Sequence, residues 1–129
     1  MKIHSLFEYA WYRVFSPNTL DFVSMGIGIE DRYHRLFPWW ANHLQSSRTL
    51  QQEALSLFGM PDEIEITILG SGRLYDVEPA IFNTRSGVHL FDYDPRSIEY
   101  CRRRFAHRSD LYLHCIDITG SMNEWTGRL

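Results

Sequence analysis

Apolar residues recur at helical spacing through the first half of the chain, which predicts helices over residues 6–15, 18–25 and 39–58. Asn18 is the expected N-cap of the second helix. Pro38 is expected to end the segment that follows that helix, because proline cannot continue the hydrogen-bond ladder. Most of the aromatic side chains in this half are expected to pack in the core or between helices. They are Trp11, Tyr12, Phe15, Tyr33, Trp39 and Trp40.

The period changes after a boundary at residues 58–63, where short β-branched and aliphatic runs begin. Three strands are predicted, over residues 63–69, 87–94 and 110–117. A short helix over 77–83, capped by Asp76, and a second helix from Pro95, capped by Asp94, are predicted between them. Strands that alternate with helices pair in parallel through right-handed crossovers. The predicted fold class is therefore α/β, a Rossmann-like parallel sheet in β-α-β-α-β order preceded by an N-terminal helical segment.

This change of pattern divides the chain into two predicted parts. Residues 1–58 are expected to form an N-terminal helical extension or lid, and residues 59–129 a Rossmann-like half-domain. The strand cores "ITIL" and "VHLF" are continuously apolar, as expected of parallel strands that are buried on both faces.

Composition narrows the classes of function. The 129 residues are 44% hydrophobic with a net charge of −3, so the chain can bury a core and has no overall basic footprint for nucleic acid. The N-terminus resembles neither a signal peptide nor a membrane span. Cys101 and Cys115 suggest no disulfide framework, so a cytoplasmic setting is expected. The six histidines form no metal-binding motif, and no metal is expected.

A glycine turn follows the first strand, in the stretch "ITILGSGRLYDVEP". A phosphate-binding P-loop needs a Lys-Ser/Thr pair that is missing here. A dinucleotide loop needs a third glycine, and Tyr75 occupies that place. Asp76 and Glu78 at the start of the next helix would also repel a diphosphate.

The remaining hypothesis is a nucleoside ligand that lacks phosphate and carries positive charge, and S-adenosylmethionine (SAM) meets that description. Gly70, Ser71 and Gly72 allow the backbone to approach the ligand closely. Asp76 would lie near the sulfonium and amino groups, while loop N–H groups and Arg73 would receive the carboxylate.

Acidic residues also end the second and third strands. Asp92 is placed where a carboxylate accepts hydrogen bonds from ribose hydroxyls, and Tyr93 could cover an adenine face. Asp117 is placed to accept from the adenine amino group. Because parallel strands end at one edge of the sheet, these residues and the glycine turn are expected to lie together.

The stretches "ITILGSGRLYDV", "VHLFDYDP" and "LHCIDITG" together resemble the nucleoside-binding half of class I SAM-dependent methyltransferases. The resemblance implies a methyltransferase domain in which Gly70 and Gly72 line the methionine moiety, Asp92 holds the ribose and Asp117 the adenine. A small-molecule acceptor is expected, with Tyr33, Arg35 and His43 as candidate lid or acceptor contacts. Family members often carry an acid where this chain has Ile68. The alternatives are a truncated or catalytically incomplete binding or scaffold module and an NAD-type domain.

In that family the sheet continues beyond the third strand, whereas this sequence stops soon after it. The strand over 64–69 would then have a free edge, which stable proteins pair or cover. Three outcomes are expected: self-association through this edge, coverage by the N-terminal helices, or a longer parent chain. Whether 129 residues suffice for activity stays open.

Overall fold

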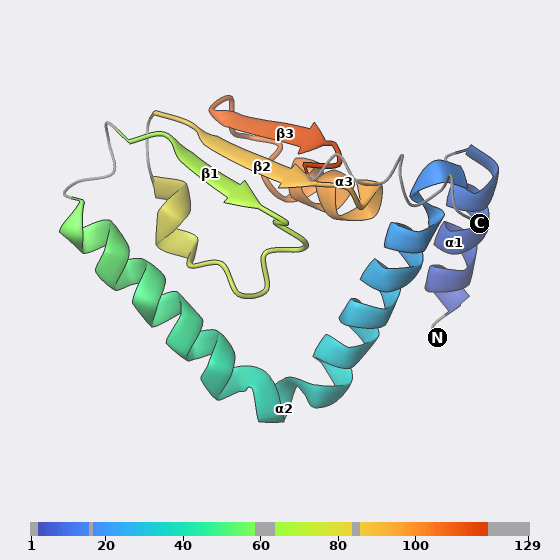
Figure 1. Cartoon of the computed structure of the whole chain (residues 1–129), viewed down its shortest axis with the longest axis horizontal. Coiled ribbons are helices and arrows are strands. Elements are labelled where there is room, and N and C mark those ends of the chain that lie inside the picture. The colour runs from blue at the N-terminus through green and yellow to red at the C-terminus, as the bar shows by residue number, and fades with distance from the viewer. Residues whose placement is uncertain (1–2, 16, 59–63, 84–85, 119–129) are drawn as a thin grey trace.

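The structure is a computed structural model that describes residues 3–15, 17–58, 64–83 and 86–118. Its elements, in chain order, are helix α1 (Ile3–Phe15), 3₁₀ helix η1 (Pro17–Thr19), helix α2 (Leu20–Leu57), strand β1 (Ile66–Leu69), 3₁₀ helix η3 (Pro79–Asn83), strand β2 (Val88–Asp92), helix α3 (Pro95–Arg104) and strand β3 (Leu111–Cys115). A helical first half followed by alternating strands and helices is thus confirmed (Figure 1).

The three strands form a parallel sheet in the order β1-β2-β3. Ile66 pairs with Val88, and Val88 pairs with Leu111, so the three strands start in step and end at one edge. Within the described part of the chain β1 pairs only with β2, which leaves the outer edge of β1 without a strand partner. An α/β fold with a small parallel sheet is therefore established.

The N-terminal helices differ from the prediction in two respects. Residues 20–57 form one continuous helix, whereas we expected a break at Pro38. Pro38 lies inside α2, and the helix bends sharply near its middle into two arms (Figure 1). An interior proline removes one backbone hydrogen bond and bends a helix without having to end it. Asn18 is not the N-cap, since Thr19 holds that position without a side-chain cap bond.

The segment after the glycine turn also differs in detail. Residues 79–83 form a 3₁₀ helix, and its cap is Glu78 rather than Asp76. The Glu78 side chain accepts a hydrogen bond from the Ala80 N–H at 3.1 Å. Pro79 is the first residue of the turn, where its missing N–H costs nothing. The cap of α3 is as predicted, because Asp94 accepts from the Arg96 N–H at 2.9 Å.

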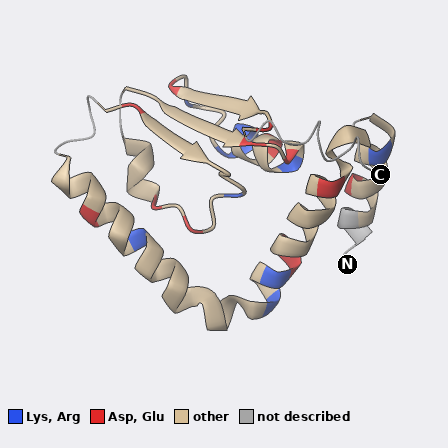
Figure 2. Ribbon diagram, in the orientation of Figure 1, with Lys and Arg blue, Asp and Glu red and all other residues tan. Residues whose placement is uncertain are grey.

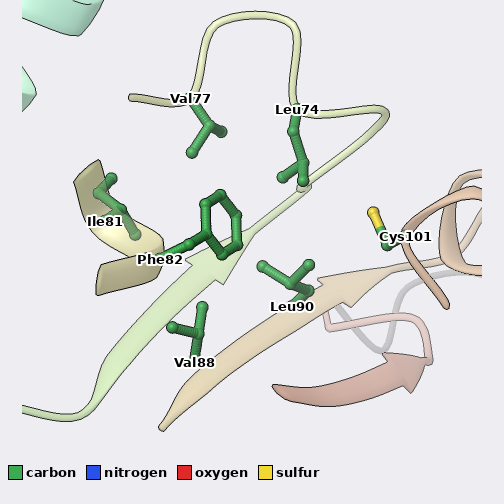
Figure 3. Packing of buried hydrophobic residues seen from close by; sticks show 7 residues of the cluster. All are labelled: Leu74, Val77, Ile81, Phe82, Val88, Leu90 and Cys101. Atoms are coloured by element: carbon green, nitrogen blue, oxygen red, sulfur yellow. The ribbon is translucent and has the colours of Figure 1, made fainter. Parts of the chain in front are cut away.

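Charged side chains lie mainly on helices and connecting segments, and the strands carry one, Asp92 (Figure 2). The core lies on one face of the sheet (Figure 3). Its members point toward one another from β2, α3, η3 and the loop before η3, and they are Leu74, Val77, Ile81, Phe82, Val88, Leu90 and Cys101. Leu55 of α2 packs against this cluster.

The opposite face of the sheet is more exposed to solvent than we expected from the continuously apolar strand sequences. On it His89 stacks on Tyr112 at 4.5 Å and Phe91 on His114 at 4.1 Å, while Leu69 is 62% exposed. Burial on both faces needs a second covering layer, and the described elements cover one face. The apolar composition of the strands therefore predicts more burial than the described elements provide.

Several of the aromatic residues expected in the core are instead exposed. Trp11 is 60% exposed and Trp39 is 83% exposed. Both lie on helices that project from the sheet, where neighbouring elements cover only part of each helix (Figure 1). None of the described helices combines the length and apolarity needed to cross a membrane.

Candidate functional site

The glycine turn after β1 is shaped by backbone geometry that favours glycine. Gly70 has φ of +65° and Gly72 has φ of +51°, in the left-handed region. A Cβ at either position would meet nothing within 4 Å, so the constraint is the backbone angle and not lack of space. Leu74, with φ of 60°, extends this conformation to a non-glycine residue.

Three N–H groups of this turn already have acceptors. Ser71 donates to the Phe91 carbonyl at 3.0 Å, and Leu74 donates to the Ser71 carbonyl at 3.1 Å. Gly72 donates to Asp92 Oδ2 at 2.6 Å. A phosphate or carboxylate cradle needs N–H groups that point at the ligand, and these three point into the protein. Our expectation that loop N–H groups receive a ligand carboxylate therefore does not hold for these three.

Asp92 joins the end of β2 to the glycine turn. Besides the Gly72 N–H, it accepts from the Asp94 N–H through Oδ1 at 2.7 Å. Each carboxylate oxygen then has one donor and one remaining lone pair. The side chain fixes the turn and still keeps acceptor capacity toward the cleft that it lines.

Asp94 follows Asp92 by two residues, lines the same cleft and is almost fully buried. Its carboxylate caps α3 and also accepts from Ser97 Oγ at 3.0 Å. Burial raises the pKa of Asp94, and the hydrogen bonds from Arg96 and Ser97 oppose that shift. Gly26 of α2 lies directly against this carboxylate, where any larger residue would collide with it.

A cleft of about 730 Å³ opens between α2 and the glycine turn. Six of the predicted ligand-binding residues line it: Gly70, Ser71, Gly72, Arg73, Asp76 and Asp92. Tyr93 and Asp117 are not among its lining residues. Tyr93 instead packs edge-on against Phe22, a cleft residue of α2, at 4.7 Å. The structure thus brings together the first two strand ends and leaves the third outside the cleft.

Residues of α2 form the opposite wall. Phe22, Met25, Ile29 and Tyr33 line the cleft at intervals of three or four residues, along one face of the helix. His43, a candidate acceptor contact, also lines it, whereas Arg35 does not. We missed this stripe because we predicted a break within residues 20–57.

Contacts from α2 also hold the loop after the glycine turn. Tyr33 stacks on Tyr75 with ring centroids 3.8 Å apart. Arg48 donates to the Tyr75 carbonyl at 2.6 Å, and Gln51 donates to the Asp76 carbonyl at 2.8 Å. Gln51 also accepts from the Glu78 N–H at 2.8 Å. Tyr75, which occupies the place of the third glycine in a dinucleotide loop, is therefore a packing partner of α2.

A charge network ties four segments together at one end of the cleft. Glu30 of α2 binds Arg73 at 2.6 Å and Arg96 at 3.0 Å. Arg96 of α3 is buried and also binds Glu8 of α1 at 2.6 Å. Arg73, which we expected to receive a ligand carboxylate, is in this structure the partner of Glu30. Sequence offered no signal for this network, because its members lie 22 to 88 residues apart along the chain.

The Ser71 hydroxyl is a buried polar group without a hydrogen-bond partner in the described part of the chain. It lies in the wall of the cleft. Such groups are uncommon in native proteins and often mark a site that a water or ligand completes. Over the same part of the chain, no cluster of three or more His, Cys, Asp or Glu side chains is placed to hold a metal ion.

Comparison of the chain with protein-family models, curated proteins and solved structures gave no match. The site is therefore interpreted from its own geometry.

Proposed function

We propose that the cleft between α2 and the glycine turn binds S-adenosylmethionine, and that the chain is the nucleoside-binding part of a methyltransferase with a Rossmann-like sheet. One observation carries the proposal. A turn with two left-handed glycines, fixed by the carboxylate at the end of the neighbouring strand, borders a cleft large enough for a nucleoside.

The charge and shape of the cleft support a ligand of this kind. Asp76 and Asp92 give the rim negative charge, which complements a sulfonium and an amino group. The N–H groups of Ser71, Gly72 and Leu74 in the turn are engaged within the protein and do not face a ligand, which argues against a phosphate-bearing ligand such as NAD or ATP. Phe22, Met25 and Ile29 supply apolar contacts for the uncharged part of the ligand.

When bound, S-adenosylmethionine supplies an electrophilic methyl group. The residues of this chain would position the nucleoside and exclude water from it, and the acceptor would be a small molecule beside the sulfonium. His43 lines the cleft and is the candidate to remove a proton from such an acceptor. A reducing, cytoplasmic setting agrees with two cysteines that form no disulfide.

A second candidate is a binding or scaffold module without turnover. The outer edge of β1 and the exposed Leu69 favour it, because unpaired strand edges and apolar surface invite a partner. Binding of S-adenosylmethionine without methyl transfer in an acceptor screen would support this alternative.

The test is a titration followed by calorimetry and by thermal stability. S-adenosylmethionine or S-adenosylhomocysteine at 100 times its Kd should add about 2.7 kcal/mol to the free energy of unfolding. NAD and ATP should add nothing. Lack of response to both SAM-type ligands would refute the proposal.

Asp92→Asn tests the placement of the ligand. The amide keeps one acceptor oxygen and puts an NH2 donor in place of the other, so either the Gly72 N–H or the Asp94 N–H loses its acceptor. Affinity should then fall at least about tenfold. Asp110→Asn is the matched control, because Asp110 precedes β3 at the opposite end of the strands and binds Arg108. Affinity is compared directly, since Asp92→Asn also lowers stability without ligand. An equal loss in both variants would contradict a site at Asp92.

A further inference from the structure

A second concavity, a groove of about 800 Å³, lies between α1 and α3. α1 contributes Phe7, Trp11 and Tyr12 to it, and α3 contributes Tyr100, Arg103 and Arg104. This volume lies in the range of sites for small organic molecules.

Aromatic rings form much of the groove wall. Phe7 is 73% exposed and Trp11 is 60% exposed, so their faces meet solvent. Tyr100 faces them from α3 as part of the same groove. Tyr100 is half-buried with the guanidinium groups of Arg73 and Arg104 beside its ring, so Phe7 and Trp11 supply the exposed aromatic surface of the groove. Exposed rings favour a planar ligand, which buries apolar area against their faces.

The charge of the groove is positive. Guanidinium groups of Arg73, Arg96, Arg103 and Arg104 line it, against the two carboxylates of Glu8 and Glu99. Basic positions gather on α3 (Figure 2).

Three of these four arginines already bind carboxylates. Glu30 binds Arg73, Glu8 binds Arg96, and Glu99 binds Arg103 at 2.7 Å. Glu99 also binds Arg102, on the same helix but outside the groove. The carboxylates of the network are thus shared among several cations.

Arg104 differs from the other three. It has no carboxylate partner among the described residues, and it donates to the Tyr100 hydroxyl at 3.2 Å. Its guanidinium lies 6.0 Å from the centre of the Tyr100 ring and 5.4 Å from that of Phe105. A guanidinium held beside aromatic rings can receive a carboxylate through two parallel hydrogen bonds.

We propose that the groove between α1 and α3 binds a planar aromatic carboxylate, with its ring against Trp11 and Phe7 and its anionic group on Arg104. This inference does not depend on the S-adenosylmethionine site. Arg73 lines both the groove and the cleft, so a ligand in the groove would lie beside the nucleoside site.

The experiment uses 2-naphthoate as the probe and its neutral amide, 2-naphthamide, as the matched ligand. Binding to the full chain is measured by calorimetry in the absence of S-adenosylmethionine. We expect naphthoate to bind at least about tenfold more tightly than naphthamide, and added salt to weaken naphthoate alone.

Arg104→Gln should weaken naphthoate at least about fivefold and leave naphthamide unchanged, because it removes the uncompensated charge. Arg102→Gln is the matched control on the same helix and should change neither. Trp11→Leu should weaken both ligands, and circular dichroism checks that the variants remain folded. Equal binding of the two ligands, equal effects of the two arginine variants, or no binding at millimolar concentration would each overturn the proposal.

Discussion

Gly26 and Gly28 lie two residues apart on α2 and should respond in opposite directions to alanine. A Cβ at Gly28 would meet nothing within 4 Å. A Cβ at Gly26 would lie closer than 3.0 Å to Asp94 Oδ2 and 3.2 Å from Asp94 Cγ. The pair therefore tests directly whether α2 packs against the start of α3.

The magnitudes follow from helix propensity and packing. Alanine is favoured over glycine inside a helix by about 1 kcal/mol, so Gly28→Ala should stabilise the protein by about that amount. Gly26→Ala gains the same amount, about 1 kcal/mol, from helix propensity. Displacement of the buried Asp94 carboxylate, however, costs about 1–3 kcal/mol. Loss of the Asp94 cap costs about 1 kcal/mol more. The net expectation is a loss of about 1–3 kcal/mol.

The assay is thermal and urea denaturation followed by circular dichroism. For a chain of this length 1 kcal/mol corresponds to about 4 °C in Tm. Gly28→Ala should raise Tm by about 4 °C, and Gly26→Ala should lower it by about 4–12 °C. Both variants lie in one helix, so a general effect on helicity cannot separate them.

A double-mutant cycle identifies the cause. Asp94→Ser keeps a cap residue but removes the carboxylate oxygen that a Cβ at Gly26 would meet. In that background Gly26→Ala should become neutral or stabilising, which gives a coupling energy of about 1–4 kcal/mol. If Gly26→Ala raised Tm in the wild type as Gly28→Ala does, the packing of α2 on Asp94 would be wrong.

Two further predictions concern titratable groups. Burial raises the pKa of the Cys101 thiol to about 11, while Cys115 is exposed, so iodoacetamide should modify Cys115 first and Cys101 only on unfolding. Mass spectrometry after limited labelling checks this, and equal labelling of both in the folded protein would contradict the buried position of Cys101. Burial also raises the pKa of Asp94 above its ordinary value of 3.8. The contribution of Asp94 to the free energy of unfolding is therefore fully present below pH 3.8, and it is lost as pH rises through the folded-state pKa. Asp94→Asn should therefore gain stability relative to the wild type as pH rises from 3.8, and urea midpoints that stay parallel across this range would refute the buried charge.

The alternation of strands and helices, and the cap at Asp94, could be predicted from local pattern. Each depends on residues that are neighbours in sequence, such as Asp94 before Pro95, or Ile98 and Cys101 on one face of α3. The glycine turn was predictable for the same reason, since a left-handed backbone selects glycine. At these positions local chemistry is enough to specify local conformation.

Pro38 shows where local rules fail. Proline is unfavourable inside a helix, yet α2 continues through it with a bend. Packing of both arms, through Tyr33 on Tyr75 and Gln51 on the loop, compensates for the lost hydrogen bond. The hydrophobic periodicity of a sequence carries no information on such distant contacts, so it cannot show that they offset the hydrogen bond lost at Pro38.

The sequence by itself determined the α/β pattern, the parallel strands and the meeting of Gly72 with Asp92, because parallel strands end at one edge. Only the tertiary structure decided which residues form the second wall of the cleft and which of its charged side chains pair with one another. Glu30 forms an ion pair with Arg73, and the face of α2 that carries Phe22 and Tyr33 supplies one wall of the cleft. The physical reason is that these contacts join residues far apart in the chain, whose approach depends on how a 38-residue bent helix packs against the loop after β1 and the start of α3.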